Sequence, residues 1–118
     1  MKNLIWKILL TYSFVLFFLL GSLNASAQMT LKYFNADWNK ANGVEWINSL
    51  DEIRTIAYVD VATDKEAQTK YKIAVIPTII IFKDGEEAIR FQADLSFKMV
   101  ATKEEVQEEI DNLLMSDF

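Results

Sequence analysis

The side chains of this sequence that could carry out chemistry are carboxylates. Cysteine and histidine are both absent from the 118 residues, so the chain has no thiolate and no imidazole base, and it lacks the Cys and His ligands that zinc, copper and haem iron usually have. A close pair of carboxylates would be the remaining route to acid–base catalysis. The candidates are Asp37, Glu45, Asp51 and Glu52. Charged residues in helical segments are more often simply solvated. We therefore expect no enzymatic activity, no metal site and no cofactor, and a carboxylate enzyme is the least favoured alternative.

The elements that would position these residues begin with a strand and a helix. Residues 31–34 and 56–61 are β-favouring runs. Apolar residues at helical spacing lie between them, at Trp46, Ile47, Leu50 and Ile53. Thr63-Asp64-Lys65-Glu66 then has the form of a capping box, which opens a second helix. The first half of the domain is therefore predicted to be strand, helix, strand and short helix.

The second half of the domain begins with a continuous apolar run. Residues 78–82 read Thr-Ile-Ile-Ile-Phe, as expected of a central strand that is covered on both faces. The following Asp84-Gly85 is typical of a two-residue hairpin turn, because both positions require positive φ. A capping box from Thr102 to Glu105 opens a last helix. The predicted element order is β-α-β-α-β-β-α, in a single domain of the α/β class.

Three stretches of the chain resemble the thioredoxin family. Residues 75–86, Val-Ile-Pro-Thr-Ile-Ile-Ile-Phe-Lys-Asp-Gly-Glu, are similar to the pattern around that family's cis-proline. Residues 34–42, Phe-Asn-Ala-Asp-Trp-Asn-Lys-Ala-Asn, are similar to its Phe-x-Ala-x-Trp-Cys-x-x-Cys segment. The third stretch is Val59-Asp60-Val61 with the later Lys70-Tyr71-Lys72-Ile73. The resemblance implies a thioredoxin-like fold for residues 28–118, with a mixed four-stranded sheet and a cis bond before Pro77.

Both cysteines of the family motif are replaced. Trp38-Asn39-Lys40-Ala41-Asn42 stands where the family has Trp-Cys-x-x-Cys, so the resemblance implies a vestigial active site at Trp38, Asn39 and Asn42 without a nucleophilic thiolate. Because asparagine is a good N-cap residue, we expect Asn39 to cap the helix that follows. By the same alignment, Tyr33 replaces the family's buried acid and Ala57 replaces the lysine opposite it. The resemblance therefore implies a redox-inactive member.

Peptide binding is the role that the resemblance leaves open. In the family, the residue before the cis-proline pairs its backbone with an extended substrate peptide, beside the tryptophan of the active-site loop. The matching residues here are Ile76, Pro77 and Trp38. Such a ledge offers main-chain hydrogen bonds to a strand-like partner, which would be a peptide or a protein. The alternative is that Pro77 and Trp38 persist only because the fold requires them.

The segment after the hairpin has the periodicity of a long strand. Apolar residues occupy alternate positions at Ile89, Phe91, Ala93, Leu95, Phe97 and Met99. A strand of this length would outgrow its partner, so Leu95 and Phe97 would cover the vestigial site or present an apolar edge to another chain. Alternatively, the 93–100 tail folds back and its side chains join the core. The second functional hypothesis is therefore a structural or self-associating domain, a homo-oligomer formed through the 93–100 edge.

The first 27 residues have the pattern of a secretory signal peptide. Lys2 and Lys7 precede an apolar run over residues 8–20, and Ala25-Ser26-Ala27 is a small-x-small cleavage site. The run is shorter than the roughly 20 residues that span a bilayer, although an uncleaved anchor remains the alternative. We predict cleavage near Ala27-Gln28 and export, either to a periplasm or to the outside.

The charge of the predicted mature chain narrows the choice of partners. Without Lys2 and Lys7, 10 basic residues remain against 17 acidic ones, a net charge of −7. Nucleic acids and anionic lipids both attract clustered Lys and Arg. We therefore expect no nucleic-acid partner.

Overall fold

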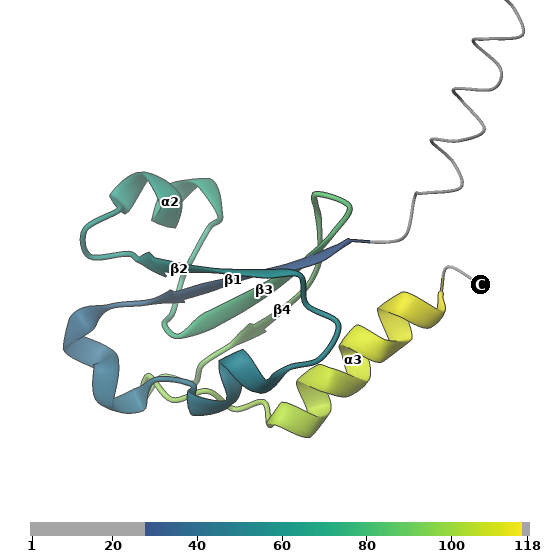
Figure 1. The fold of residues 1–118 in the computed structure, drawn as a ribbon. Helices are drawn as coiled ribbons and strands as arrows, with labels where there is room; N and C mark the ends of the chain where they lie inside the picture. The colour runs from purple at the N-terminus through teal and green to yellow at the C-terminus, as the bar shows by residue number, and fades with distance from the viewer. Residues whose placement is uncertain (1–27, 117–118) are drawn as a thin grey trace, which may run out of the picture.

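The protein is a three-layer α/β domain, seen in a computed structural model that describes residues 28–116 (Figure 1). The predicted signal peptide, residues 1–27, lies outside the described residues. The elements are β1 (Met29–Asn35), the 3₁₀ helices η1 (Asp37–Asn42) and η2 (Glu45–Ser49), β2 (Thr55–Asp60), α2 (Lys65–Lys70), β3 (Thr78–Lys83), β4 (Glu86–Gln92) and α3 (Lys103–Met115). In the part of the chain that the structure describes, no helix is both long and apolar enough to cross a membrane.

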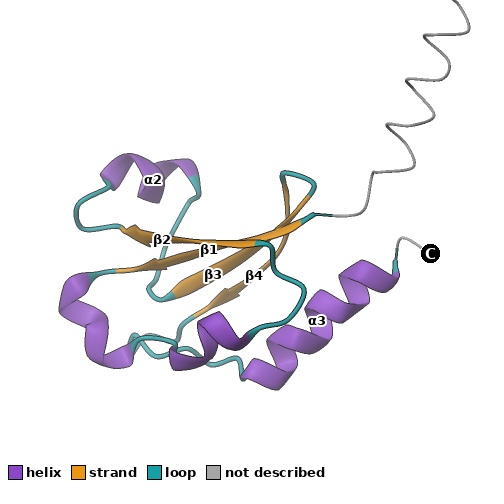
Figure 2. Ribbon diagram, viewed as in Figure 1, coloured by secondary structure: helices purple, strands orange, loops and turns teal. Residues whose placement is uncertain are grey.

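The four strands form one mixed sheet, as predicted, and their order in it is β2-β1-β3-β4. β1 runs parallel to β2 and antiparallel to β3, and β3 runs antiparallel to β4. Figure 2 shows α2 on one side of the sheet, with the 3₁₀ helices and α3 on the other. The predicted fold class is therefore confirmed.

The central position of β3 is explained by its side chains. Ile79 and Ile81 pack into the core on the α3 side, whereas Ile80 and Phe82 pack on the α2 side. All four are buried, which confirms the prediction of a strand covered on both faces. The turn that follows has positive φ at both Asp84 and Gly85, so the predicted hairpin is also confirmed.

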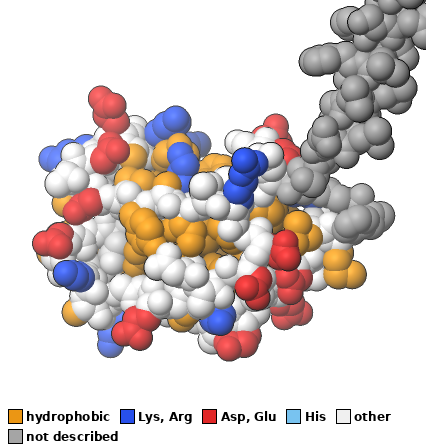
Figure 3. Space-filling view, in the orientation of Figure 1, with side chains coloured by type: hydrophobic (Ala, Val, Ile, Leu, Met, Phe, Trp, Pro, Cys, Tyr) orange, Lys and Arg blue, Asp and Glu red, His pale blue; other side chains and the backbone are white. Residues whose placement is uncertain are grey.

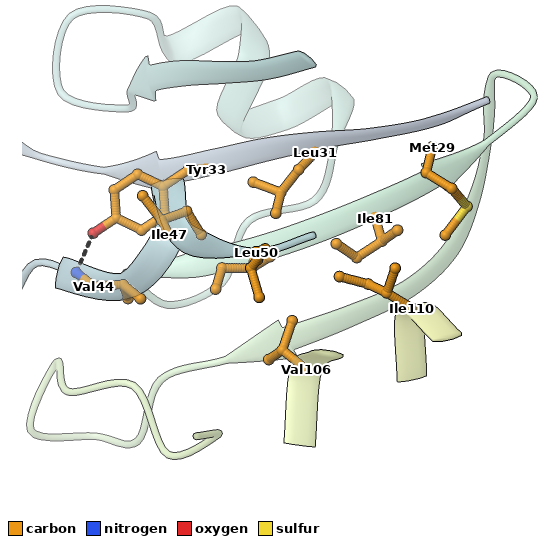
Figure 4. Packing of buried hydrophobic residues seen from close by; sticks show 10 residues of the cluster. Met29, Leu31, Tyr33, Val44, Ile47, Leu50, Ile81, Val106 and Ile110 are labelled. Atoms are coloured by element: carbon orange, nitrogen blue, oxygen red, sulfur yellow. Dashed lines mark hydrogen bonds between the residues drawn. The ribbon is translucent and has the colours of Figure 1, made fainter. Parts of the chain in front are cut away.

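The core on the α3 side carries the larger share of the apolar packing. Its buried members are Met29, Leu31, Tyr33, Val44, Ile47, Leu50, Ile79, Ile81, Val106 and Ile110 (Figure 4). They come from β1, β3, α3 and the segment between β1 and β2. Burying an apolar side chain of this size contributes about 1.5–3 kcal/mol, so this cluster fixes that segment against the sheet.

The predicted first helix is wrong in form. The structure has two short 3₁₀ helices that are separated at Gly43, whose backbone is extended with φ −62° and ψ 151°. The N–H group of Val44 donates to the Tyr33 hydroxyl at 2.9 Å instead of to a helical carbonyl. Ile47 and Leu50 are nevertheless buried. Apolar spacing identified which residues enter the core, but not the break that the tyrosine imposes.

One of the two predicted helix caps is correct. The Thr102 hydroxyl accepts from the Glu105 N–H group at 3.2 Å at the start of α3. At the start of α2 the cap is Asp64, whose carboxylate accepts from the Ala67 N–H group at 3.0 Å. Thr63 instead donates its hydroxyl to the Asp60 carbonyl. The cap lies at Asp64 instead of Thr63 because aspartate is at least as good an N-cap residue as threonine and stands at the position where the helix begins.

Candidate functional site: a thiol-free loop and its groove

Asn39 is the centre of a side-chain hydrogen-bond network at the predicted vestigial site. It is 4% exposed. Its Nδ2 donates to Asn35 Oδ1 at 3.1 Å and to the Phe97 carbonyl at 3.2 Å. Its Oδ1 accepts from Asn42 Nδ2 at 2.9 Å. The amide therefore joins three segments: the end of β1, η1 and the loop after β4.

The prediction that Asn39 is an N-cap is wrong. Ala36 is at the N-cap position of η1 without a side-chain cap, and the Asn39 N–H group donates to the Ala36 carbonyl at 2.9 Å. Asn39 lies inside the element, with φ −104° and ψ 17°. Its side chain bonds Asn35 and the Phe97 carbonyl, which belong to other segments of the chain, so the amide cross-links those segments.

Tyr33 holds the next part of the loop in place. Its hydroxyl accepts from the Val44 N–H group at 2.9 Å (Figure 4). It also accepts from Asn35 Nδ2 at 3.2 Å. Its ring packs edge-on against Tyr58, with 5.9 Å between ring centroids. The strand register places Tyr58 opposite Tyr33 and Ala57 opposite Lys32. The residue opposite Tyr33 is therefore Tyr58, one residue beyond the expected Ala57.

The 93–100 tail folds back on itself. β4 ends at Gln92, and an isolated antiparallel bridge joins Ala93 to Met99. Asp94 closes this loop: its Oδ1 accepts from the N–H groups of Ser96 and Lys98 at 2.8 and 3.3 Å. The hydrogen bonds from Ser96 hold the pKa of Asp94 below its usual value.

The predicted strand extension is therefore wrong, and the alternative of a folded tail is correct in part. Alternating apolar residues suggested a strand, but an aspartate whose side chain bonds the backbone competes with strand pairing. Met99 packs against the core as that alternative requires. Leu95 instead points to solvent, with 91% of its surface exposed.

Phe97 packs on Trp38 in an edge-to-face pair. Their ring centroids are 5.2 Å apart at an interplanar angle of 87°. Phe97 and Trp38 are 40% and 64% exposed, respectively. Phe97 has φ 64°, a positive value that is costly for a bulky residue. The bond from Asn39 to the Phe97 carbonyl helps to hold this conformation, so the aromatic pair is fixed by the network behind it.

A groove of about 290 Å³ lies beside the aromatic pair. Its lining residues are Trp38, Val61, Ala62, Lys65, Gln68, Ile73, Ala74, Val75, Ile76 and Phe97. The Ile76–Pro77 peptide bond is cis. Among the described residues, nothing hydrogen-bonds to the N–H or carbonyl group of Ile76. The groove therefore combines an aromatic wall, an apolar floor and a backbone edge without an intramolecular partner.

The structure brings together only some of the predicted site residues. Trp38, Phe97 and Ile76 line the groove. Pro77 is buried behind it, and its carbonyl accepts from the Ala93 N–H group at 3.0 Å. Leu95 does not line the groove. Sequence reasoning missed Lys65 and Gln68, which come from α2 and reach the groove only through the packing of that helix on the sheet. A lysine and a glutamine in a predicted helix do not by themselves indicate that they line a groove.

The predicted carboxylates do not form a single cluster. Asp37 and Glu45 line a separate cleft of about 610 Å³ beside Tyr33 and Tyr58. Asp51 lies instead against α3, where its N–H group donates to Gln107 Oε1 at 2.8 Å. Within residues 28–116, no group of three or more acidic side chains is arranged to hold a metal ion.

Comparison with known proteins identifies the family. The thioredoxin family profile matches residues 23–111, and the chain belongs to that family. A curated relative, the thioredoxin of Mycoplasma pneumoniae, is 34% identical over 76 residues, which cover 60% of this chain and 74% of the relative. With no cysteine, this member has no thiol with which to form the mixed disulfide of thiol–disulfide exchange.

Solved structures show the same fold. A mutant thioredoxin from Halobacterium salinarum NRC-1 is similar with a TM-score of 0.59 and 20% identity, over 72% of this chain and 74% of that one. Thioredoxin-2, a component of malaria parasite protein secretion machinery, has a TM-score of 0.54 and 17% identity, over 75% and 86% of the two chains.

Proposed function

We propose that this protein is an exported, redox-inactive thioredoxin-family domain that binds an extended segment of a peptide or partner protein. The observation that carries the proposal is the groove beside Ile76, whose backbone N–H and carbonyl groups have no partner among the described residues. Pairing with an extended chain would satisfy both groups, which is the mode of recognition in which a peptide adds to a backbone edge.

The walls of the groove favour a peptide with an apolar side chain next to the paired residue. Trp38 and Phe97 form a rigid aromatic wall, and Ile73 and Ile76 contribute to the floor. Large aromatic side chains provide contact area at a low cost in conformational entropy. Lys65 on the α2 side adds a positive charge to the lining, so an acidic neighbour in the peptide would be tolerated.

The Asn39 network prepares the groove for binding. The Asn39 amide bonds the Phe97 carbonyl, and the Phe97 ring packs on Trp38. The wall is thus ordered before a ligand arrives, which lowers the entropy that binding must overcome. In this proposal, the polar residues in the cysteine positions shape the binding surface.

Export is the second part of the proposal, and it rests on the pattern of residues 1–27. A basic start, an apolar run and Ala25-Ser26-Ala27 fit a cleaved signal peptide. Mass spectrometry of the protein recovered from cells tests this part. Loss of residues 1–27 supports it, and an intact N-terminus contradicts it.

Peptide binding is tested with a library of extended peptides and matched variants. We expect calorimetry to give a binder whose affinity falls at least about tenfold on Trp38→Ala, because an aromatic anchor is lost. Leu95→Ala is the control: Leu95 is also an exposed apolar residue, but it lies off the groove. A library without binders, or binders indifferent to Trp38→Ala, would refute the binding role.

Self-association through the 93–100 loop is the second candidate. It is favoured by the exposure of Leu95 and Val100, two apolar side chains on one short loop. If this surface forms the interface, Leu95→Asp will abolish concentration-dependent association in sedimentation. Unchanged sedimentation of that variant would exclude the loop as the interface.

A further inference from the structure

β2 is an edge strand with little cover. It lies at one end of the sheet order, and the side chains of Thr55, Ala57 and Tyr58 are exposed. Within residues 28–116, the only strand that pairs with it is β1. Figure 3 shows hydrophobic side chains gathered over the sheet between the layers of α2 and α3. An edge of this kind is a template for a further strand.

The backbone groups that face outward on β2 can be assigned from the pairing at its end. The Val61 N–H group donates to the carbonyl of Asn35, the last residue of β1, at 3.0 Å and so points toward β1. Along a strand the direction of these groups alternates from one residue to the next. From Thr55 onward the odd-numbered residues of β2 therefore bond β1, and Ile56 and Tyr58 point their N–H and carbonyl groups away from the sheet. Arg54, just before the strand, also donates its N–H group to β1, so the alternation begins at Thr55.

The opposite edge of the sheet, β4, is protected. It carries Glu86, Glu87 and Arg90, and its register with β3 shifts between Ile81 and Phe82. Charges and bulges of this kind discourage edge-to-edge pairing. β2 carries no charged side chain between its first residue and Asp60. The two edges therefore differ in their capacity to accept another strand.

We infer that β2 pairs antiparallel with β2 of a second copy of this chain, about a two-fold axis at Ala57. In this register Ile56 of each copy lies opposite Tyr58 of the other. These outward-facing residues then exchange N–H···O bonds, as the hydrogen-bonded pairs of an antiparallel ladder do. Ala57 lies between them, opposite the same residue of the other copy, as a non-hydrogen-bonded pair.

The side chains of β2 are self-complementary in the same register. Ile56 meets the ring of Tyr58. Arg54, the residue before β2, lies opposite Asp60 of the other copy, whose carboxylate also accepts from the Asp37 and Ala62 N–H groups of its own chain. The Arg54 N–H group donates to the Met29 carbonyl within its own copy, so this pair contributes through side chains alone. The Arg54 side chain forms no ion pair or hydrogen bond with any described residue and is available to the second copy.

These cross-strand pairs favour a closed dimer. Opposite charges and apolar–aromatic contacts across neighbouring strands are both stabilising. Because the axis passes through Ala57, every pair except Ala57 with itself occurs twice, and no β2 edge is left open for a third copy. A symmetric contact of this kind is the usual arrangement in homodimers.

The experiment compares the same substitution on the two edges. Ala57→Lys places two lysines face to face at the two-fold axis, whereas Ala88→Lys changes an exposed alanine on β4. Using protein produced from the full-length gene, we expect sedimentation to show a dimer for the parent and for Ala88→Lys, and a monomer for Ala57→Lys. Circular dichroism should show the same fold for all three proteins.

Cross-linking gives a second readout, because the chain has no cysteine of its own. Facing residues of a non-hydrogen-bonded pair have Cα atoms about 4.5 Å apart, which is within disulfide reach. Ala57→Cys should therefore form an intermolecular disulfide under mild oxidation much faster than Ala88→Cys.

Three results overturn the inference. The first is a parent that is monomeric at all concentrations, and the second is equal cross-linking of the two cysteine variants. The third is a dimer that is lost on Leu95→Asp but kept on Ala57→Lys, which would place the interface on the 93–100 loop.

Discussion

The β3–β4 hairpin and the segment between β1 and β2 are held in place by different forces. β3 is fixed by side chains buried on both of its faces, with Ile79, Ile80 and Ile81 fully inaccessible. The segment of η1 and η2 is short and irregular, and its polar side chains cross-link it through Asn39 and Tyr33. Apolar burial is tolerant of the exact contacts, whereas a polar network depends on each donor and acceptor. Single polar substitutions should therefore change the geometry of the η1–η2 segment, which holds the family's cysteine positions, more than that of the hairpin.

The largest effect is expected from Ile81→Ala in β3. Deleting a fully buried isoleucine side chain should lower the free energy of unfolding by about 2–5 kcal/mol, because it leaves a cavity in the core on the α3 side. Urea denaturation measures the change. Val100→Ala, which truncates an exposed side chain, is the control and should change it by less than about 0.5 kcal/mol. Equal effects of the two would mean that β3 is not the packed centre of the sheet.

Asn39→Asp should be the most damaging polar change. A carboxylate cannot donate, so it would face Asn35 Oδ1 and the Phe97 carbonyl without a hydrogen to share. We expect a loss of about 2–3 kcal/mol in the free energy of unfolding. Asn39→Ala should cost no more than Asn39→Asp, and denaturation of both variants checks the order. If the aspartate were instead neutral or stabilising, Asn39 would be acting as a helix cap after all.

Tyr33→Phe removes one hydroxyl and leaves the buried Val44 N–H group without its acceptor. The expected cost is about 1–2 kcal/mol in the free energy of unfolding. Tyr58→Phe is the matched control, because its hydroxyl bonds Asn48 at the exposed surface. Denaturation curves that coincide for the two variants would show that the Tyr33 hydroxyl does not hold the loop.

The smallest effect is the pH dependence of the 93–100 loop. Because the hydrogen bonds from Ser96 depress the pKa of Asp94 in the folded state, its contribution to stability is present above the ordinary aspartate pKa and is lost as pH falls through the folded value. Thermal unfolding of the parent and of Asp94→Asn should differ slightly at pH 7 and converge on acidification. If the difference in thermal stability between the two proteins stays constant with pH, the ionised Asp94 carboxylate does not stabilise the loop.

The sequence was sufficient for the parts of the fold that depend on apolar pattern and turn chemistry. The continuous run at 78–82, the Asp84-Gly85 turn and the Thr102 cap each follow from a local rule, and each was found where it was expected. The failures occurred where a polar side chain bonds a distant or unexpected partner. Tyr33 interrupts the first helix, and Asp94 turns the tail away from the sheet. Neither bond has a periodic signature, because each depends on where the backbone has already been placed.

The sequence predicted only those residues of the candidate site that match positions of the thioredoxin motif. Trp38 and Ile76 were identified from the resemblance and do line the groove, whereas the contribution of α2 was not visible in the sequence. The position of Phe97 was expected from strand alternation, yet the ring reaches Trp38 because the tail folds back instead.

Amide hydrogen exchange at Ile76 shows whether a bound peptide pairs with this backbone edge. The Ile76 N–H group has no acceptor among the described residues, so in the free protein it should exchange much faster than the N–H groups of β3. Nuclear magnetic resonance can follow it as a peptide from the library is added. We expect exchange at Ile76 to slow on binding and to return to its free rate with Trp38→Ala. Protection that appears elsewhere while the Ile76 rate stays unchanged would contradict this pairing.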